Sequence, residues 1–198
     1  MENIKWNELR DRAYQNAVNH GFHEKPLEIE HYLMLVITEL SEAVNADRKN
    51  LRANINDYIK GLEQSDIVAN TYSYDTDIYR ETRPDKVFEK YIKDTVEDEL
   101  ADAAIRLLDF AGAFNYNIDI GLFQEESYAE LSEELEKFSF TKIIYTVIIS
   151  FKDVRTNISS ILYYLFAIAW HYKIDLLWHI EQKMKYNENR PYKHGKKY

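Results

Sequence analysis

Apolar residues recur along much of this chain at intervals of three and four, the spacing that places them on one face of an α-helix. This pattern predicts helices over residues 3–20, 27–49, 86–115, 122–138, 158–172 and 174–189. Gly21 suits the end of the first helix, and Pro26 suits the first turn of the second. The chain is therefore predicted to be all-α, a helical bundle in which residues 1–198 form a single domain.

Two stretches are harder to assign from this pattern. Residues 142–151 are β-branched and suit a strand, but their neighbours are helical and no partner strand is evident, so we expect a helix. Residues 50–95 are irregular: a short helix is expected to end near Gly61, and the polar, tyrosine-rich residues 70–84 are expected to form a loop. Because long loops in compact domains are usually functional or mobile, we interpret 50–95 as an insertion, and a lid is one role that it suits.

Two of the predicted helices carry pairs of carboxylates. Glu39 and Glu42 are three residues apart, as are Glu99 and Asp102, so each pair lies on one helix face. Both pairs occur inside strongly apolar stretches, residues 33–44 and 96–108. If the two helices pack with these faces together, four carboxylates meet in a partly dry site.

Electrostatics limits what such a site can be. Two like charges ~4 Å apart repel by about 4 kcal/mol at an effective dielectric constant of ~20. The cluster therefore needs raised pKa values or a compensating cation, and an all-oxygen ligand set suits Mg²⁺ or Mn²⁺. The plainer alternative is that both pairs are solvated charges on helix surfaces.

The segments around these pairs resemble the metal-binding helices of a known family. Residues 33–49, LMLVITELSEAVNADRK, and 96–119, VEDELADAAIRLLDFAGAFNYNID, are similar to the metal-bearing helices of the all-α nucleoside triphosphate pyrophosphohydrolases, the MazG-like and dimeric-dUTPase-like superfamily. Residues 183–197 resemble its C-terminal helix and basic tail. The resemblance implies a pyrophosphohydrolase-type helical bundle with inserted segments, working as a homodimer or homotetramer.

The resemblance also implies an activity, the Mg²⁺- or Mn²⁺-dependent hydrolysis of a nucleoside triphosphate to the monophosphate and pyrophosphate, as nucleotide-pool housekeeping. Metal would neutralise the triphosphate, lower the pKa of a bound water and stabilise the displaced pyrophosphate. Whether one of the ligands or a neighbour, Glu97 or Asp98, orients the water stays open. The metal ligands and catalytic residues would be Glu39, Glu42, Glu99 and Asp102.

Basic residues are concentrated near the C-terminal end of the sequence. Lys183 and Asn187 are four residues apart and share a helix face, and Arg190 follows within a turn. Lysine offers phosphate a point charge, asparagine a hydrogen bond and arginine a bidentate contact. We therefore predict that these three residues bind the substrate and that 190–198 form a basic tail. The alternative is that they lie on the exposed side of the last helix.

Other features leave the substrate open. Trp6, Tyr14, Phe22 and the tyrosines at 72–79 are available to stack on a nucleobase, but each also suits the core or a loop. Thr38 stands where members of the family often have Glu, and residues 43–98 lengthen a gap that is usually short in the family. These departures favour an alternative function, a catalytically inactive helical interaction protein that retains the fold.

Composition narrows the class of protein further. The net charge of −9 argues against general nucleic-acid binding, which needs a basic face. The absence of cysteine excludes disulfides and zinc–thiolate sites, and it fits a reducing cytoplasm. The longest apolar run, residues 161–170, is too short to cross ~30 Å of hydrocarbon. We therefore expect a cytoplasmic protein with neither membrane nor nucleic acid as a partner.

Overall fold

The computed structural model describes residues 4–72, 76–120 and 125–195. Every regular element in these ranges is helical, which confirms the predicted all-α class. None of the described helices is long and apolar enough to cross a membrane. The elements are α1 (Trp6–Asn19), α2 (Ile29–Arg48), α3 (Ile55–Thr71), α4 (Asp77–Thr82), α5 (Pro84–Tyr91), α6 (Val96–Ala113), α7 (Glu125–Leu135), α8 (Phe140–Ile149), α9 (Val154–His171) and α10 (Leu176–Glu188), with two short 3₁₀ turns, η1 (Ser150–Asp153) and η2 (Tyr192–Gly195).

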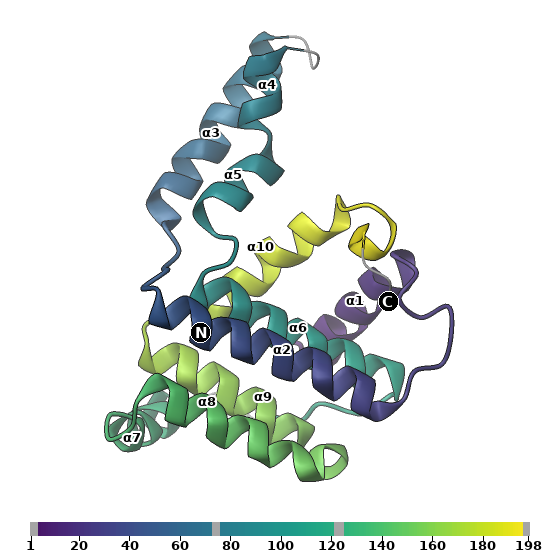
Figure 1. Cartoon of the computed structure of the whole chain (residues 1–198), viewed down its shortest axis with the longest axis vertical. Helices are drawn as coiled ribbons and strands as arrows, with labels where there is room; N and C mark the ends of the chain where they lie inside the picture. Colours follow the sequence, from purple (N-terminus) through teal and green to yellow (C-terminus); the bar gives the residue numbers. More distant parts are fainter. Residues whose placement is uncertain (1–3, 73–75, 121–124, 196–198) are drawn as a thin grey trace.

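Helix α6 is the centre of the bundle. It packs against α1, α2, α9 and α10, and Figure 1 shows these helices grouped around it. Leu100, Leu107 and Phe110 are among the α6 side chains with no exposed surface. Because its apolar side chains pack against α1, α2, α9 and α10, α6 is held firmly within the bundle. Helices α7, α8 and α9 complete the bundle, with α7 packed on α9 and α8 on α2.

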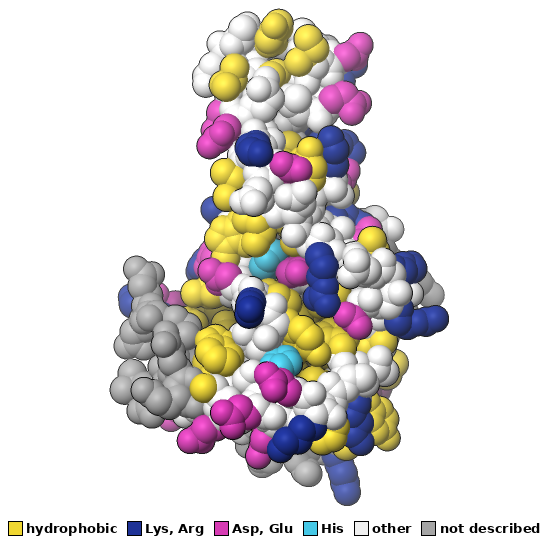
Figure 2. Space-filling view, turned by 90° about the vertical axis from the view of Figure 1, so that its left-hand side faces the viewer, with side chains coloured by type: hydrophobic (Ala, Val, Ile, Leu, Met, Phe, Trp, Pro, Cys, Tyr) yellow, Lys and Arg dark blue, Asp and Glu magenta, His cyan; other side chains and the backbone are white. Residues whose placement is uncertain are grey.

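Helices α3, α4 and α5 form a hairpin that projects away from the bundle (Figure 1). α3 packs against α4 and α5, around a small cluster that includes Tyr58 and Phe88. Trp178 and Tyr186 of α10 pack against this cluster and connect it to the body. Figure 2 shows hydrophobic side chains near the far end of the hairpin.

The structure corrects two predictions within residues 50–95. The helix expected to end near Gly61 continues to Thr71 as α3. Gly61 marks a close approach of helices instead, because a Cβ atom there would lie 2.5 Å from Cγ1 of Val87 on α5. The expected loop over 70–84 contains α4, whose first turn is capped by the Thr76 hydroxyl accepting a hydrogen bond from the Tyr79 amide. Residues 73–75 lie outside the described part of the chain.

The single helix predicted over 86–115 is two helices, α5 and α6, separated by a break at residues 92–95. α5 ends at Tyr91 and α6 begins at Val96, because the intervening Asp94 adopts a positive φ of 62°. The Thr95 hydroxyl then caps α6 by accepting a hydrogen bond from the Asp98 amide at 3.3 Å. This break directs the chain from the hairpin into the bundle.

The remaining helix predictions are confirmed, with shifted ends. Residues 142–151 lie mainly in α8, not in a strand, and Phe140, Ile143, Ile144 and Val147 form its buried face. Gly21 has φ of 80° and ends the turn after α1. In the predicted basic tail, Lys193 N donates to His20 O at 2.9 Å, whereas residues 196–198 lie outside the described residues.

We predict that Gly61→Leu loosens the hairpin, because the new side chain must displace Val87. Overpacking of this kind costs about 1–3 kcal/mol. Amide hydrogen exchange over residues 55–91 should accelerate in this variant, and Val87→Ala should restore part of the protection. Gln64→Leu is the matched control, since Gln64 is exposed on the same helix. Equal exchange in the Gly61 and Gln64 variants would contradict the proposed close contact.

Candidate functional site

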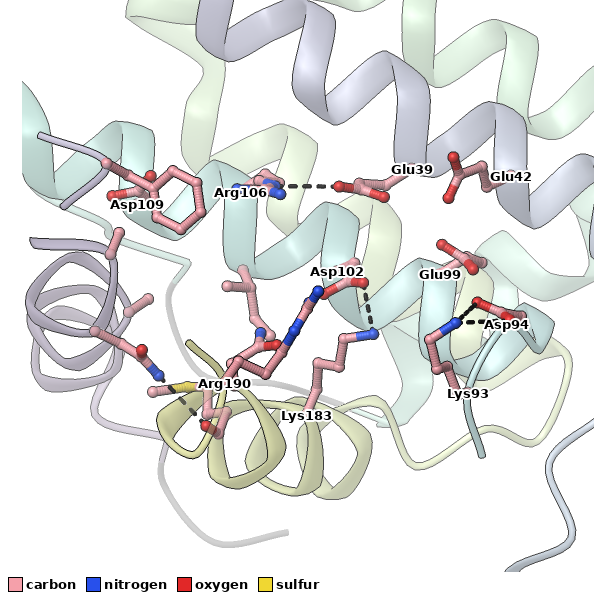
Figure 3. Close-up of a pocket in the computed structure, with 17 residues that line it drawn as sticks. Glu39, Glu42, Lys93, Asp94, Glu99, Asp102, Arg106, Asp109, Lys183 and Arg190 are labelled. Atoms are coloured by element: carbon pink, nitrogen blue, oxygen red, sulfur yellow. Dashed lines mark hydrogen bonds and ion pairs between the residues drawn. The ribbon is translucent and has the colours of Figure 1, made fainter. Parts of the chain in front are cut away.

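A cavity of about 240 Å³ lies where α1, α2, α6 and α10 meet. Figure 3 shows its two kinds of wall, carboxylates on α2 and α6 and basic side chains from α10 and the residues that follow it. The structure thus brings the predicted site residues together, although their roles stay predictions. Those lining the cavity are Glu39, Glu42, Glu99, Asp102, Lys183, Asn187 and Arg190.

Three of the four predicted metal ligands form a compact group. Glu39, Glu42 and Glu99 each place one carboxylate oxygen within 4.8 Å of the other two. Glu39 and Glu99 are buried, whereas Glu42 is exposed. Burial, together with the charges of Asp102 and Asp98, raises the pKa of Glu99 to about 9. The group therefore takes up a positive charge readily, and its donor set fits a hard divalent cation.

The fourth predicted ligand, Asp102, is held by Lys183. The Lys183 ammonium lies 2.7 Å from Asp102 Oδ2 and 2.8 Å from both carboxylate oxygens of Asp98. Burial alone would lower the pKa of Lys183, but Asp102 and Asp98 outweigh it and the pKa is raised. An ammonium has three N–H donors, and three oxygens already accept them. A direct phosphate contact, as predicted for Lys183, would require it to leave one of these oxygens.

A second, half-buried cation supports the α2 side of the group. Arg106 Nε donates to Glu39 Oε1 at 3.1 Å. Burial and the charge of Asp102 raise the pKa of Glu39, and Arg106 opposes this rise. Arg106 therefore keeps one ligand oxygen oriented while the other faces the group.

Arg190 and Asn187 line the same cavity as the carboxylates, and the guanidinium carbon of Arg190 lies 5.7 Å from the centroid of the Tyr186 ring. Arg190 lines the cavity and has no ion pair among the described residues, and Figure 3 shows its guanidinium reaching toward Asp102. The side-chain oxygen of Asn187 is buried and has no hydrogen-bond partner within the described chain. Unpaired buried polar atoms are rare in proteins, so the Asn187 oxygen, an acceptor, indicates a donor that the described chain does not supply.

Several cavity residues were missed by the sequence analysis. Lys93 and Asp94 reach the cavity from the break before α6, which no helical pattern reveals. Arg106 and Asp109 were detectable, because they extend the α6 face of Glu99 at helical spacing.

The aromatic residues considered for stacking on a nucleobase lie in different parts of the structure. Trp6 is buried in the core, and Tyr14 packs on His23 with ring centroids 4.7 Å apart. Tyr79 lies on the hairpin helix α4. Phe22 lines the cavity.

No protein-family model, curated protein or solved structure matched this chain. The function is therefore argued from the cavity, together with the resemblance of its two carboxylate-bearing helices.

We predict that Glu99→Gln has opposite effects on stability without and with metal. In the folded, metal-free protein Glu99 keeps its proton up to about pH 9, against an ordinary pKa of 4.5. The folded state then binds more protons than the unfolded chain between these values, so stability falls as pH rises through this window. Glu99→Gln removes that loss and should raise the metal-free melting temperature at pH 8, by about 2–4 °C per kcal/mol regained, with little change at pH 4.

With Mg²⁺ or Mn²⁺ present, we expect Glu99→Gln to melt at a lower temperature than the wild type. Metal bound to the folded state raises the melting temperature of the wild type, and Glu99→Gln should lose most of that rise. Thermal melting with and without chelator measures both effects. Glu30→Gln, an exposed position on α2, is the control. A variant that melts like the wild type in all four conditions would contradict the assignment.

Proposed function

We propose that this protein is a divalent-metal-dependent nucleotide pyrophosphohydrolase, which cleaves a nucleoside triphosphate between the α- and β-phosphates. One observation carries the proposal: the carboxylates of Glu39, Glu42 and Glu99 converge in the cavity that Arg190 also lines, without an ion pair among the described residues. A metal ion would bind the three carboxylates, and a phosphate chain bound to that metal would pair with Arg190. The resemblance of the flanking helices to pyrophosphohydrolases supports this particular reaction.

The acidic group would hold the metal. Glu39 and Glu99 are buried on rigid helices and Glu42 is exposed beside them, so the ligands are fixed while one side stays open. Bound metal would neutralise the phosphates and lower the pKa of a coordinated water. In the reaction, the water oxygen bonds to the α-phosphorus as the bond to the bridging oxygen breaks, which releases pyrophosphate and a proton.

The basic wall would position the phosphate chain. Arg190 can donate two parallel hydrogen bonds to phosphate oxygens, and Asn187 can donate from its amide nitrogen. Fixed donors that face charge developing on the leaving pyrophosphate favour the transition state over the ground state. Lys183 acts differently here, because it orients Asp102 by the ion pair at 2.7 Å.

A second candidate function is a helical interaction protein that retains the fold without catalysis. The ion pairs favour it, since Lys183 and Arg106 already supply positive charge to Asp102 and Glu39. Thr38 in place of the acid frequent in the family points the same way. Under either function, the cytoplasmic location and the homo-oligomeric state stay predictions.

Release of pyrophosphate from a panel of NTPs and dNTPs with Mg²⁺ separates the two functions. We predict metal-dependent release by the wild type and almost none by Glu42→Gln. Glu42 is exposed and makes no ion pair in the described structure, so its substitution removes a ligand oxygen without disturbing the fold. Arg190→Met should lower kcat/KM by roughly tenfold to a hundredfold, the loss of one charge-assisted hydrogen bond or more.

Matched controls make this experiment specific. Lys185→Met removes an exposed cation from α10 and should leave kcat/KM close to the wild-type value. Metal-induced stabilisation should persist in Arg190→Met, because this residue contacts phosphate in the proposal and not the metal. Absence of pyrophosphate release from every nucleotide, in a folded protein that binds metal, would favour the interaction protein.

A further inference from the structure

The cavity continues beyond the carboxylates to a second end. Glu99, Asp102, Arg106 and Asp109 follow one another at spacings of three, four and three residues, and all line the cavity. They therefore share one face of α6, and the ten helical steps from Glu99 to Asp109 extend ~15 Å along the helix. Figure 3 shows Asp109 at the opposite end from Glu99 and Glu42. A nucleotide with its phosphates at the carboxylates would extend toward Asp109.

A chain of hydrogen bonds fixes the Asp109 side chain. Its Oδ1 lies 2.7 Å from His23 Nε2, and His23 Nδ1 lies 3.2 Å from the Tyr32 hydroxyl. Burial and the Asp109 charge raise the pKa of Tyr32 to about 12, so Tyr32 keeps its proton and donates to Nδ1. His23 then carries its proton on Nε2 and donates it to Asp109.

This chain leaves Asp109 with an unused acceptor. The side chain is 7% exposed, and its second oxygen, Oδ2, has no hydrogen-bond partner among the described residues. The hydrolytic proposal gives this carboxylate no role. An acceptor atom of a largely buried carboxylate that lines a cavity is available to a hydrogen-bond donor of a ligand.

An aromatic ring lies at the same end of the cavity. Phe22 lines it next to His23 in sequence, and its ring centroid is 5.9 Å from the Arg106 guanidinium carbon. Ala13 and Ala17 of α1 contribute small side chains to the lining. An aromatic surface beside one oriented polar group is the usual composition of a site for a flat heterocycle.

Building on the proposed function, we propose that the Asp109 end of this cavity is a nucleobase subsite. In it Phe22 contacts the face of the base, and Asp109 accepts a hydrogen bond from an exocyclic amino group. Cytosine and adenine carry an amino donor where uracil and hypoxanthine carry a carbonyl acceptor. A carboxylate held by His23 has no proton to offer a carbonyl, so two acceptors would face each other. The substrate class is therefore nucleotides whose base carries an exocyclic amino group, namely those of cytosine, adenine and guanine.

Pairs of nucleotides whose bases carry either an amino group or a carbonyl at the same position test this preference. Pyrophosphate release should give kcat/KM values roughly tenfold to a hundredfold higher for CTP than for UTP, and likewise for ATP than for ITP. In Asp109→Asn the amide offers both a donor and an acceptor, so both ratios should fall toward one. Phe22→Leu should lower kcat/KM for both members of a pair and leave their ratio unchanged.

The outcomes separate this inference from the hydrolytic proposal on which it rests. Hydrolysis of both members of each pair at equal rates by the wild type would overturn the subsite and leave the hydrolase intact. Ratios unchanged in a folded Asp109→Asn would overturn the role of Asp109. No hydrolysis of any nucleotide would overturn both proposals. If Asp109→Asn does not fold, the wild-type ratios and those of Phe22→Leu still decide the base preference.

Discussion

Negative charge gathered between α2 and α6 is the constraint that the whole site must satisfy. Glu39, Asp98 and Glu99 are almost fully buried, and uncompensated carboxylates in such a place repel strongly. Two basic side chains of the fold, Lys183 and Arg106, form ion pairs with carboxylates of this group. Lys183 offsets part of the charge of Asp98 and Asp102, and Arg106 offsets part of that of Glu39. The compact group of Glu39, Glu42 and Glu99 is left short of positive charge.

This partial compensation distinguishes the site from a structural salt-bridge network. A network that only stabilises a fold pairs its charges internally, and breaking one buried pair costs about 3–5 kcal/mol. Here the acidic excess lies on one wall of a cavity, and the Arg190 guanidinium, which has no ion pair among the described residues, lies on another. Unpaired negative charge and unpaired positive charge therefore lie on different walls of the cavity. A metal ion would offset the first, and a phosphate chain would offset the second.

The fold places this charge on its most rigid element. α6 is enclosed by α1, α2, α9 and α10, so its polar face cannot relax by moving into solvent. The same helix carries Glu99, a proposed metal ligand, at one end of the cavity and Asp109 at the other. The rise of this single helix thereby sets the distance between the Glu99 and Asp109 ends of the cavity.

Much of this arrangement is local in sequence, and that part was predictable. Helical spacing identified Glu39, Glu42, Glu99 and Asp102, and the apolar residues around them indicated that the faces would be buried together. The spacing of apolar and polar residues did not predict features that depend on tertiary contacts or on local backbone conformation. Gly61 reads as a helix end but accommodates Val87, and the turn at Asp94 that separates α5 from α6 depends on a positive φ.

The role of Lys183 could not be predicted from the sequence, because it too depends on tertiary contacts. Its spacing with Asn187 gives a shared helix face, but nothing in that spacing shows that Asp98 and Asp102 lie across from it. Only packing of α10 on α6 reveals that its donors are occupied. Lysines on a terminal helix are usually exposed, so a buried one required the structure.

Location of bound Mn²⁺ by its anomalous X-ray scattering tests the central claim most directly. In crystals grown with saturating Mn²⁺, the account predicts a peak at coordination distance from carboxylate oxygens of Glu39, Glu42 and Glu99, and no such peak in Glu42→Gln. Lys183 should keep its contact with Asp102. Mn²⁺ bound only elsewhere, or a protein that shows no peak at this group, would contradict the assignment of the buried charge to a metal.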